Sequence, residues 1–409
     1  MTEKRNKKTF ALTTKIFIGL ILGVIVGLLM QNHADFATSY IKPLGTLFLN
    51  LIKLIIVPLV FSSLLVGVAD LDDVTKLGKI GLKTIAFFLI TTAVAIIIGL
   101  ALANIGNVGG NFVLPAEQIT VETKEAPSII DTLLNTVPAN PLEALVEGRM
   151  LQIIVFAIIM GAGLLAVNEK AVVVFDFFRG ITEAMYVIIA GVMKFAPIGV
   201  FGLIVPVIAE NGPEVLLPLL RLIIIVYAAC LIHMGLVYTF AVKISNYPIK
   251  KFYKAVFKPW LIAFTTSSSS GTLPITIQTA EEDLGVPKPI ASFVLPLGAT
   301  INMDGTSIYQ GVCALFIAQV YGISLTIGQQ LTIVLTATLA SIGAAGVPGA
   351  GMIMLGMVLE SVGLPIEGIA LVAGVDRLLD MMRTSVNVVG DIACSIFVSR
   401  TEGELDHIK

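Results

Sequence analysis

The chain has 409 residues, of which 56% are hydrophobic and only 13% are charged, and its formal net charge is −2. A soluble protein carries about 25% charged residues, whereas the mean hydropathy here is +0.95. Repeated apolar stretches reach the ~20 residues that cross a bilayer, so the sequence predicts an all-α polytopic membrane protein. Near-neutral charge without a basic, aromatic-rich patch argues against nucleic acid as a partner.

The basic residues predict the orientation. The N-terminus, MTEKRNKKTF, leads into an apolar run over residues 16–29, and no small-residue cleavage site follows it. We therefore expect a first membrane helix and not a removed signal peptide. Lysines cluster again at 76–83 and 250–258, whereas the loop over 107–127 is acidic. Because cytoplasmic loops are enriched in Lys and Arg, we expect a multi-pass protein of the inner (plasma) membrane with both termini in the cytoplasm.

The first half of the chain predicts ordinary spans. Pro138 and Pro141 interrupt the fourth of them, because a proline and the residue before it do not stay helical. The expected spans cover residues 11–31, 41–69, 80–105, 129–167, 175–208 and 214–243.

The second half contains two apolar segments with polar or glycine-rich centres. The first has the serine run Ser267–Ser270 followed by Gly271, and the second has the tip Gly343–Gly351 with Pro348. Each predicts a helical hairpin that enters the membrane without crossing it, over about 249–283 and 327–361, and a flexible external loop is the alternative. A long helix with polar interruptions follows each, over about 288–322 and 366–401. Such paired interruptions indicate the binding site of a repeat-built transporter.

The last of these helices carries a polar stripe. Its polar residues are spaced by three or four, so they share one helical face; they are Asp376, Asp380, Arg383, Asn387 and Asp391. Ionisable groups at membrane depth mark a solute or ion pathway. The alternative is a buried ion-pair network that only holds helices together.

The polar side chains predict two kinds of ligand. Asn302, Asp304, Asn387 and Asp391 offer the oxygens that a hard cation such as Na⁺ prefers, and no His/Cys cluster suggests a transition metal. The Arg383 fork matches a carboxylate. Asp380 could receive an ammonium group, and a half-helix N-terminus at a hairpin tip could bind a second carboxylate. Together these groups predict an acidic amino acid as substrate. His233, in an apolar helix, is interpreted as a packing residue more than as a proton relay.

Four motifs, SSSSGTLP, GATINMDGT, SIGAAGVPGAG and DRLLDMMRTSVNVVGD, resemble the dicarboxylate/amino acid:cation symporter family, the glutamate transporter family. The resemblance covers the chain from its first helix to Glu402. It implies eight transmembrane helices, two re-entrant hairpins, inverted repeats and a homotrimer that works as an elevator. It also implies scaffold helices over 11–70 and 109–208, the latter including an external loop. The transport domain would comprise 78–108 and 214–401.

The resemblance also assigns roles to residues. Substrate contacts would fall on Ser269, Thr306, Val347, Gly351, Asp380, Arg383, Thr384 and Asn387. One Na⁺ site would fall on Gly298, Asn302, Asn387 and Asp391. A second would fall on Thr300, Ser341, Ile342 and Ala344 with Met303 near, and a third on Phe88, Thr91, Thr92, Asn302 and Asp304. The Gly343–Gly351 tip would close over the substrate as a gate.

Three positions depart from the family pattern. Archaeal relatives carry an arginine at the position of Ser267 and animal relatives carry one at Met381, and Arg377 is the candidate replacement in this chain. Animal proton-coupled members carry a glutamate where this chain has Gln310, and an amide does not carry a proton near neutral pH.

Several alternatives remain open. A C4-dicarboxylate carrier, a neutral amino acid carrier or a proton-coupled glutamate carrier would share the fold, and the sequence does not choose between aspartate and glutamate. An intramembrane aspartyl enzyme using Asp376 and Asp380 is disfavoured, because Arg383 beside them would hold both carboxylates ionised. We therefore expect a transporter and not an enzyme.

Overall fold

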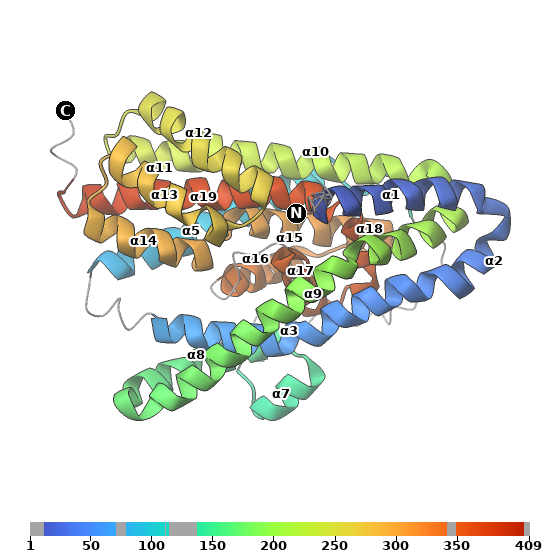
Figure 1. Cartoon of the computed structure of the whole chain (residues 1–409), viewed down its shortest axis with the longest axis horizontal. Coiled ribbons are helices and arrows are strands. Elements are labelled where there is room, and N and C mark those ends of the chain that lie inside the picture. The colour runs from blue at the N-terminus through green and yellow to red at the C-terminus, as the bar shows by residue number, and fades with distance from the viewer. Residues whose placement is uncertain (1–11, 71–78, 111, 114–136, 342–348, 405–409) are drawn as a thin grey trace, which may run out of the picture.

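The computed structural model describes residues 12–70, 79–110, 112–113, 137–341 and 349–404. All regular secondary structure in these ranges is helical, and the helices form two groups that lie side by side (Figure 1). The fold is thus an all-α bundle, as the apolar composition predicts.

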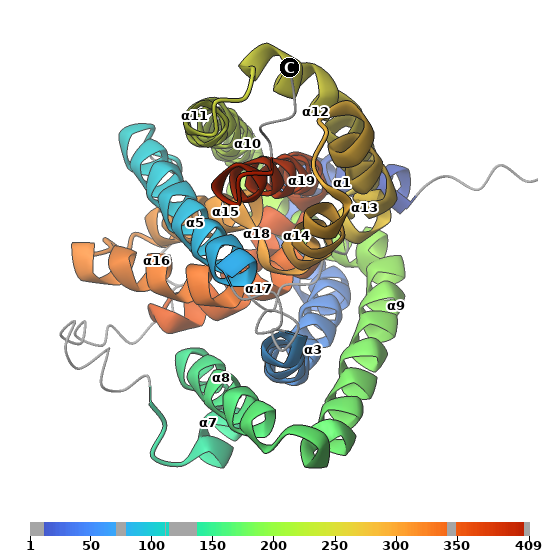
Figure 2. The ribbon, with the colours of Figure 1, turned by 90° about the vertical axis from the view of Figure 1, so that its left-hand side faces the viewer.

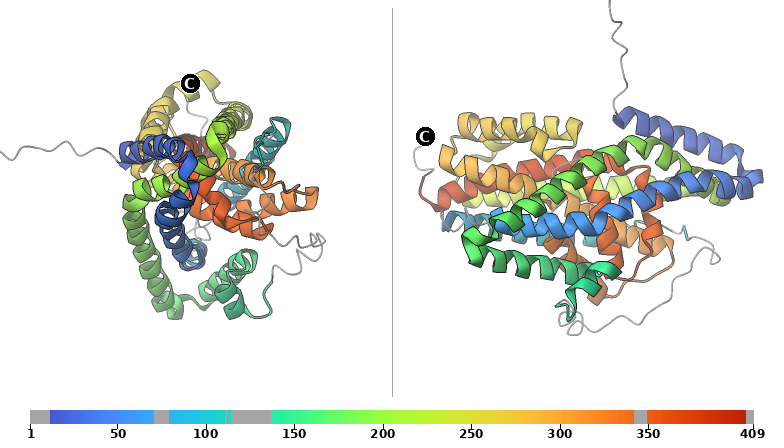
Figure 3. Two further views of the ribbon diagram at one scale, coloured as in Figure 1. Left: turned by 90° about the vertical axis from the view of Figure 1, so that its right-hand side faces the viewer. Right: turned by 60° about the horizontal axis from the view of Figure 1, so that its bottom comes forward.

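The first group is built around α9. It comprises α1 (Leu12–Leu29), η1 (Gln31–His33), α2 (Ala34–Phe36), η2 (Ala37–Ile41), α3 (Lys42–Asp70), α7 (Pro141–Glu147), α8 (Met150–Val167), η4 (Asn168–Ala171), α9 (Val172–Asn211) and η5 (Gly212–Val215). Helix α9 packs along both α1 and α3, and α3 also packs on α8. Figure 3 shows this group from two further sides.

Glycines allow the close packing of α1 on α9. Gly19, Gly23 and Gly27 recur every four residues and so share one face of α1. A Cβ atom built on Gly27 would lie 2.8 Å from the Cβ atom of Ile208 on α9. Small residues let membrane helices approach closely and gain van der Waals contact, so this stripe fixes the α1–α9 pair.

The second group surrounds α15 and α19. It comprises α5 (Lys79–Ile105), α10 (Leu216–His233), η6 (Met234–Tyr238), α11 (Thr239–Ile244), α12 (Ile249–Thr266), α13 (Ser269–Gln278), η7 (Thr279–Asp283), α14 (Lys288–Ile301), α15 (Asp304–Val320), α16 (Ile327–Ser341), α17 (Ala350–Ser361), η8 (Ile366–Gly368), α18 (Ile369–Ala373) and α19 (Asp376–Thr401). Figure 2 looks along α19, which the other helices of the group enclose. Nearly every side chain of α15 and α19 is buried, so their polar residues face protein and not lipid.

Four described helical stretches are long and apolar enough to cross a membrane: Lys79–Ile105, Glu169–Glu210, Gly212–Ile244 and Asp376–Thr401. A fifth is counted if the bent pair Thr14–Leu29 and Gln31–Phe48, which meet at 75°, is one span. Breaks divide the remaining apolar sequence into shorter pieces, such as α14 with 14 residues and α15 with 17. The protein is therefore integral to the membrane, and eight spans with two re-entrant hairpins stay an expectation.

Candidate substrate and cation site

The polar stripe of α19 points into the protein. Asp376, Asp380, Arg383, Asn387 and Asp391 are each at most 7% exposed, and Arg383 has no exposed surface. The helical spacing that placed them on one face in the sequence therefore places them on the buried face. Helices α12, α14 and α15 pack against α19, and α15 together with the break before it supplies partners for Arg383, Asn387 and Asp391.

Arg383 is held by two carboxylates of its own helix. Its Nη1 donates to Asp376 Oδ1 at 3.0 Å and its Nη2 donates to Asp380 Oδ1 at 2.8 Å. The guanidinium also lies over the ring of Tyr309 on α15, 3.9 Å from the centroid. Charge pairing and the cation–π contact compensate the guanidinium for its lost hydration. The Arg383 guanidinium thus donates hydrogen bonds to carboxylates, and a substrate carboxylate would require the same donors.

Two glycines make room for Arg383. A Cβ atom on Gly351 of α17 would lie 2.9 Å from Cζ of Arg383, and a Cβ atom on Gly305 of α15 would overlap the Arg383 carbonyl oxygen. Helix α15 therefore approaches α19 more closely than a side chain at position 305 would allow, whereas a side chain at position 351 would displace the Arg383 head. Gly351 borders the functional group of Arg383, whereas Gly305 sets the spacing of the helices.

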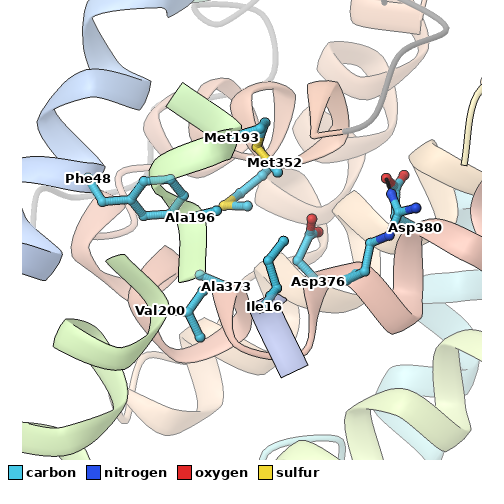
Figure 4. A pocket seen from close by; sticks show the side chains of 10 residues that line it. Ile16, Phe48, Met193, Ala196, Val200, Met352, Ala373, Asp376 and Asp380 are labelled. Atoms are coloured by element: carbon cyan, nitrogen blue, oxygen red, sulfur yellow. Dashed lines mark ion pairs between the residues drawn. The ribbon is translucent and has the colours of Figure 1, made fainter. Parts of the chain in front are cut away.

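A small cavity borders the two acids at the contact between the helix groups (Figure 4). Its volume is about 10 Å³, roughly that needed by one water molecule. Asp376, Arg377 and Asp380 line one side, and apolar residues complete it, namely Ile16, Phe48, Met193, Ala196, Val200, Met352 and Ala373. This cavity does not hold an amino acid, so ligand entry here requires side chains or helices to move.

The turn between α12 and α13 lies near Arg377 of α19. Ser267 adopts a left-handed conformation with φ +52°, and the Ser268 side chain caps α13 by accepting from the Gly271 amide at 3.0 Å. Ser269 begins α13 and is buried. Arg377 Nη2 donates to the Thr266 carbonyl oxygen at 3.4 Å and its Nη1 is 3.6 Å from Asp380 Oδ2. Arg377 therefore reaches the turn that contains Ser267.

The break between α14 and α15 forms a second polar cluster. Asn302 Nδ2 donates to Asp391 Oδ1 at 2.8 Å and to the Asn387 carbonyl oxygen at 2.9 Å. The Gly305 amide donates to Asn387 Oδ1 at 2.8 Å. Asn302 Oδ1 is buried and has no hydrogen-bond donor within the described part of the chain. An orphaned buried oxygen beside a carboxylate suits a cation ligand set.

Asp304 is the centre of a third cluster and is fully buried. Thr92 Oγ1 donates to Asp304 Oδ1 at 2.6 Å, and Thr91 Oγ1 lies 3.3 Å from the same atom. On the other oxygen, Oδ2, the Tyr238 hydroxyl donates at 2.8 Å and His233 Nε2 lies at 3.0 Å. Four side chains from α5, α10 and η6 thus fix the orientation of one carboxylate.

Of the other residues named by the resemblance, some contact the polar clusters, some bond only within their own helix, and some lie outside the described residues. Phe88 is buried, and Gly298 packs so closely on Asp391 that a Cβ atom would overlap the carboxylate. Thr306 Oγ1 accepts from Asn387 Nδ2 at 3.3 Å, Met303 Sδ lies 3.3 Å from the same nitrogen, and Thr384 is buried. Thr300 and Ser341 bond to carbonyl groups of their own helices, Leu297 and Thr338. Ile342, Ala344, Val347 and most of the tip that contains them lie outside the described residues.

Three aromatic or basic residues were not predicted to contact the polar clusters. Tyr309 stacks on Arg383, and Tyr238 and His233 bond to Asp304. For His233, the interpretation as a packing residue stays a prediction, and the partner of its Nε2 is the Asp304 carboxylate. A tyrosine or histidine inside an apolar helix is the only sequence signal for such a contact, since a buried Tyr or His needs a polar partner.

Buried acids, amides and one guanidinium inside an apolar helical bundle define a membrane carrier of a small charged solute. The chain belongs to the sodium:dicarboxylate symporter family, whose match spans residues 12–401. The family consists of transporters and not enzymes.

Named relatives align along nearly the whole chain. The chain is 42% identical to the proton/sodium-glutamate symport protein of Geobacillus stearothermophilus, covering 98% of this chain and 97% of that protein. It is 37% identical to the proton/glutamate-aspartate symporter of Escherichia coli, covering 98% and 95%. It is 35% identical to the C4-dicarboxylate transport protein of Bacillus subtilis, covering 97% and 95%.

Proposed function

We propose that this protein is a secondary active symporter that moves L-aspartate or L-glutamate into the cell together with Na⁺. The observation that carries the proposal is the fully buried Arg383, whose fork spans Asp376 and Asp380. A buried guanidinium with exchangeable acidic partners is suited to bind the side-chain carboxylate of a substrate. The relatives named for glutamate transport support the same substrate class.

The pairing suggests how the site tolerates being empty. Without substrate, Asp376 and Asp380 are balanced by Arg383 together with Arg377, whose Nη1 lies 3.6 Å from Asp380 Oδ2, so no lone charge is left buried. A substrate carboxylate would take over guanidinium donors, and Asp380, once released, would accept the substrate ammonium group. Binding therefore exchanges one set of charge pairs for another, and the uncompensated charge inside the membrane stays small throughout.

The cation would bind at the Asn302–Asp391 and Asp304 clusters. Their carboxylate, amide and hydroxyl oxygens match the preference of Na⁺ for hard ligands, and the family is one of sodium symporters. The two helix groups support a division into a scaffold and a moving transport domain, with the small cavity beside Asp376 at their contact. A homotrimer, an elevator movement and cytoplasmic termini belong to the same proposal.

Uptake of radiolabelled L-aspartate and L-glutamate into proteoliposomes tests the proposal. We expect accumulation when an inward Na⁺ gradient is imposed and none when choline replaces Na⁺ and only a proton gradient is present. Equal uptake in both conditions would remove Na⁺ from the mechanism.

The C4-dicarboxylate alternative is favoured by the relative that is named for such substrates. Asp380 separates the two functions, because succinate has no ammonium group for this acid to bind. The Asp380→Asn variant should lose affinity for aspartate and retain more of any affinity for succinate. Equal losses for both ligands would show that Asp380 does not bind the substrate amine, and a wild-type preference for succinate would favour the alternative.

A further inference from the structure

A wide apolar groove lies between α5, the η6–α11 segment and the last turns of α19. Its volume is about 680 Å³, within the range of pockets that hold small molecules. Apart from Lys83 and Thr91, every residue that lines it is apolar. The groove thus differs from the polar clusters, which are built from carboxylates and amides.

The groove is open on one side. Ile90, Leu236 and Phe240 line it and are 63%, 64% and 62% exposed. Its inner wall includes Phe87, which is 8% exposed and whose ring lies 5.3 Å from that of Phe397 on α19. Because these helices belong to an integral membrane protein, the open side faces hydrocarbon.

One end of the groove is basic. Lys83 lines it, and its Nζ donates to Glu402 Oε1 at 2.5 Å and to the Thr401 carbonyl oxygen at 3.0 Å. Lys79 lies one helical turn before Lys83, and Lys243 precedes Ile244, which also lines the groove; both lysines are exposed. Among these described residues, three lysines stand against the single acid Glu402. Lysines next to an apolar surface at a helix end attract anionic lipid headgroups.

We propose that the groove holds one acyl chain of an anionic phospholipid, whose phosphate is bound by Lys83 and the neighbouring lysines. The acyl chain packs against the apolar residues of the groove, and the lipid phosphate competes with the Glu402 carboxylate for Lys83. The inference depends on the membrane location and not on the identity of the transported solute.

The bound chain would also pack behind the Asp304 cluster. Thr91 lines the groove, and its Oγ1 lies 3.3 Å from Asp304 Oδ1. Thr91 therefore lies between the groove and the carboxylate proposed to bind a cation.

A tryptophan placed in the groove tests the proposal. Trp260 is the only tryptophan of the chain, so Trp260→Phe provides a silent background into which Phe240→Trp is introduced. The protein is reconstituted in vesicles of phosphatidylcholine and phosphatidylglycerol at one fixed composition, in which either the first or the second lipid carries brominated chains. We expect brominated phosphatidylglycerol to quench this tryptophan more strongly per mole fraction than brominated phosphatidylcholine.

Two controls separate a selective site from ordinary lipid contact. Ile97→Trp, 53% exposed on α5 and outside the groove lining, should be quenched by both lipids in proportion to their mole fractions. Lys83→Gln should weaken the preference for phosphatidylglycerol by about five-fold, the contribution of one lysine, whereas Lys83→Arg should retain it. Equal quenching by both lipids at position 240 would overturn headgroup selection, and absent quenching there would show that lipid chains do not enter the groove.

Discussion

A guanidinium without exposed surface requires anionic partners, and Arg383 has two on its own helix and an aromatic ring above it. The spacing of seven and three residues brings Asp376 and Asp380 to the same face as Arg383. The network could be purely structural, as the sequence alone allowed. Gly351 of α17 packs against the guanidinium with no side chain between them, and the family resemblance assigns both residues to the substrate site, which favours a binding role.

Replacing Arg383 tests its role in binding. Removing one member of a buried, charge-assisted pair costs about 2–5 kcal/mol, so Arg383→Ala should weaken aspartate or glutamate binding roughly 30-fold to several thousand-fold. Neutral amino acids should then compete better, since Asp380 is left to bind the ammonium group. Arg149→Ala is the matched control, because that arginine pairs with Glu143 with about half of its side chain exposed. Unchanged affinity in Arg383→Ala would place the acidic substrate elsewhere.

Tyr238, which donates a hydrogen bond to Asp304, allows a test of cation binding at that carboxylate. Tyr238→Phe removes one donor from the buried Asp304 carboxylate, which should destabilise the protein by about 1–3 kcal/mol in choline. A Na⁺ ion bound at Asp304 would compensate the lost donor, so the loss should be smaller in Na⁺. Thermal unfolding of the purified protein in the two salts measures the difference.

Tyr253→Phe is the matched control for this measurement. The Tyr253 hydroxyl donates to the Met234 carbonyl oxygen at 2.7 Å and lies 2.8 Å from Thr239 Oγ1, and within the described residues it has no hydrogen bond to an acid. Its loss should therefore be equal in Na⁺ and choline. If Tyr238→Phe behaves in the same way as this control, Asp304 does not bind Na⁺.

At the scale of helices, apolar runs and their interruptions predicted most of the elements. The polar interruption that begins at Asn302 coincides with the break between α14 and α15, which covers Asn302 and Met303, whereas Gly305 already lies in α15. An asparagine weakens a helix where polar groups find partners across the bundle. Pairings between distant elements could not be predicted. Tyr238 and Asp304 are 66 residues apart, and helical periodicity carries no information on which helices meet.

Glycine at a helix contact gives a prediction at this scale. Gly351→Ala should not reduce thermal stability, because alanine favours a helix by roughly 0.5–1 kcal/mol and the flexible Arg383 head can move away. The displaced guanidinium should lose a hydrogen bond to the substrate, worth about 1.5–3 kcal/mol, so affinity should fall at least about tenfold. Gly163→Ala in α8, with open space around it, should leave affinity unchanged. A stable Gly351→Ala variant with wild-type affinity would show that Arg383 need not approach α17.

For the whole molecule, the proposed function places the substrate and the cations along α19, so we expect this helix to couple their binding. Arg383 at its start and Asp391 further along are separated by about two turns, and Asn387 between them bonds to Gly305 and Thr306 of α15. A cation that restricts the backbone at the Asn302 break would therefore also restrict the helix that carries Arg383. The substrate would then lose less conformational entropy on binding, so the two ligands can be coupled without direct contact.

The last prediction concerns the ions that are not coupled. Gln310 is buried in α15, and its Oε1 has no hydrogen-bond donor within the described part of the chain. An amide does not titrate near neutral pH, so this position carries no proton, although relatives are named as proton/sodium symporters. We expect uptake to depend little on internal K⁺ and to require no proton influx. Vesicles loaded with K⁺ or with choline, at a fixed Na⁺ gradient and clamped voltage, provide the comparison. A several-fold stimulation by internal K⁺, or external alkalinisation in step with substrate entry, would show that another residue carries the counter-ion or the proton. The buried acids Asp304 and Asp391 would then be the first residues to replace by asparagine.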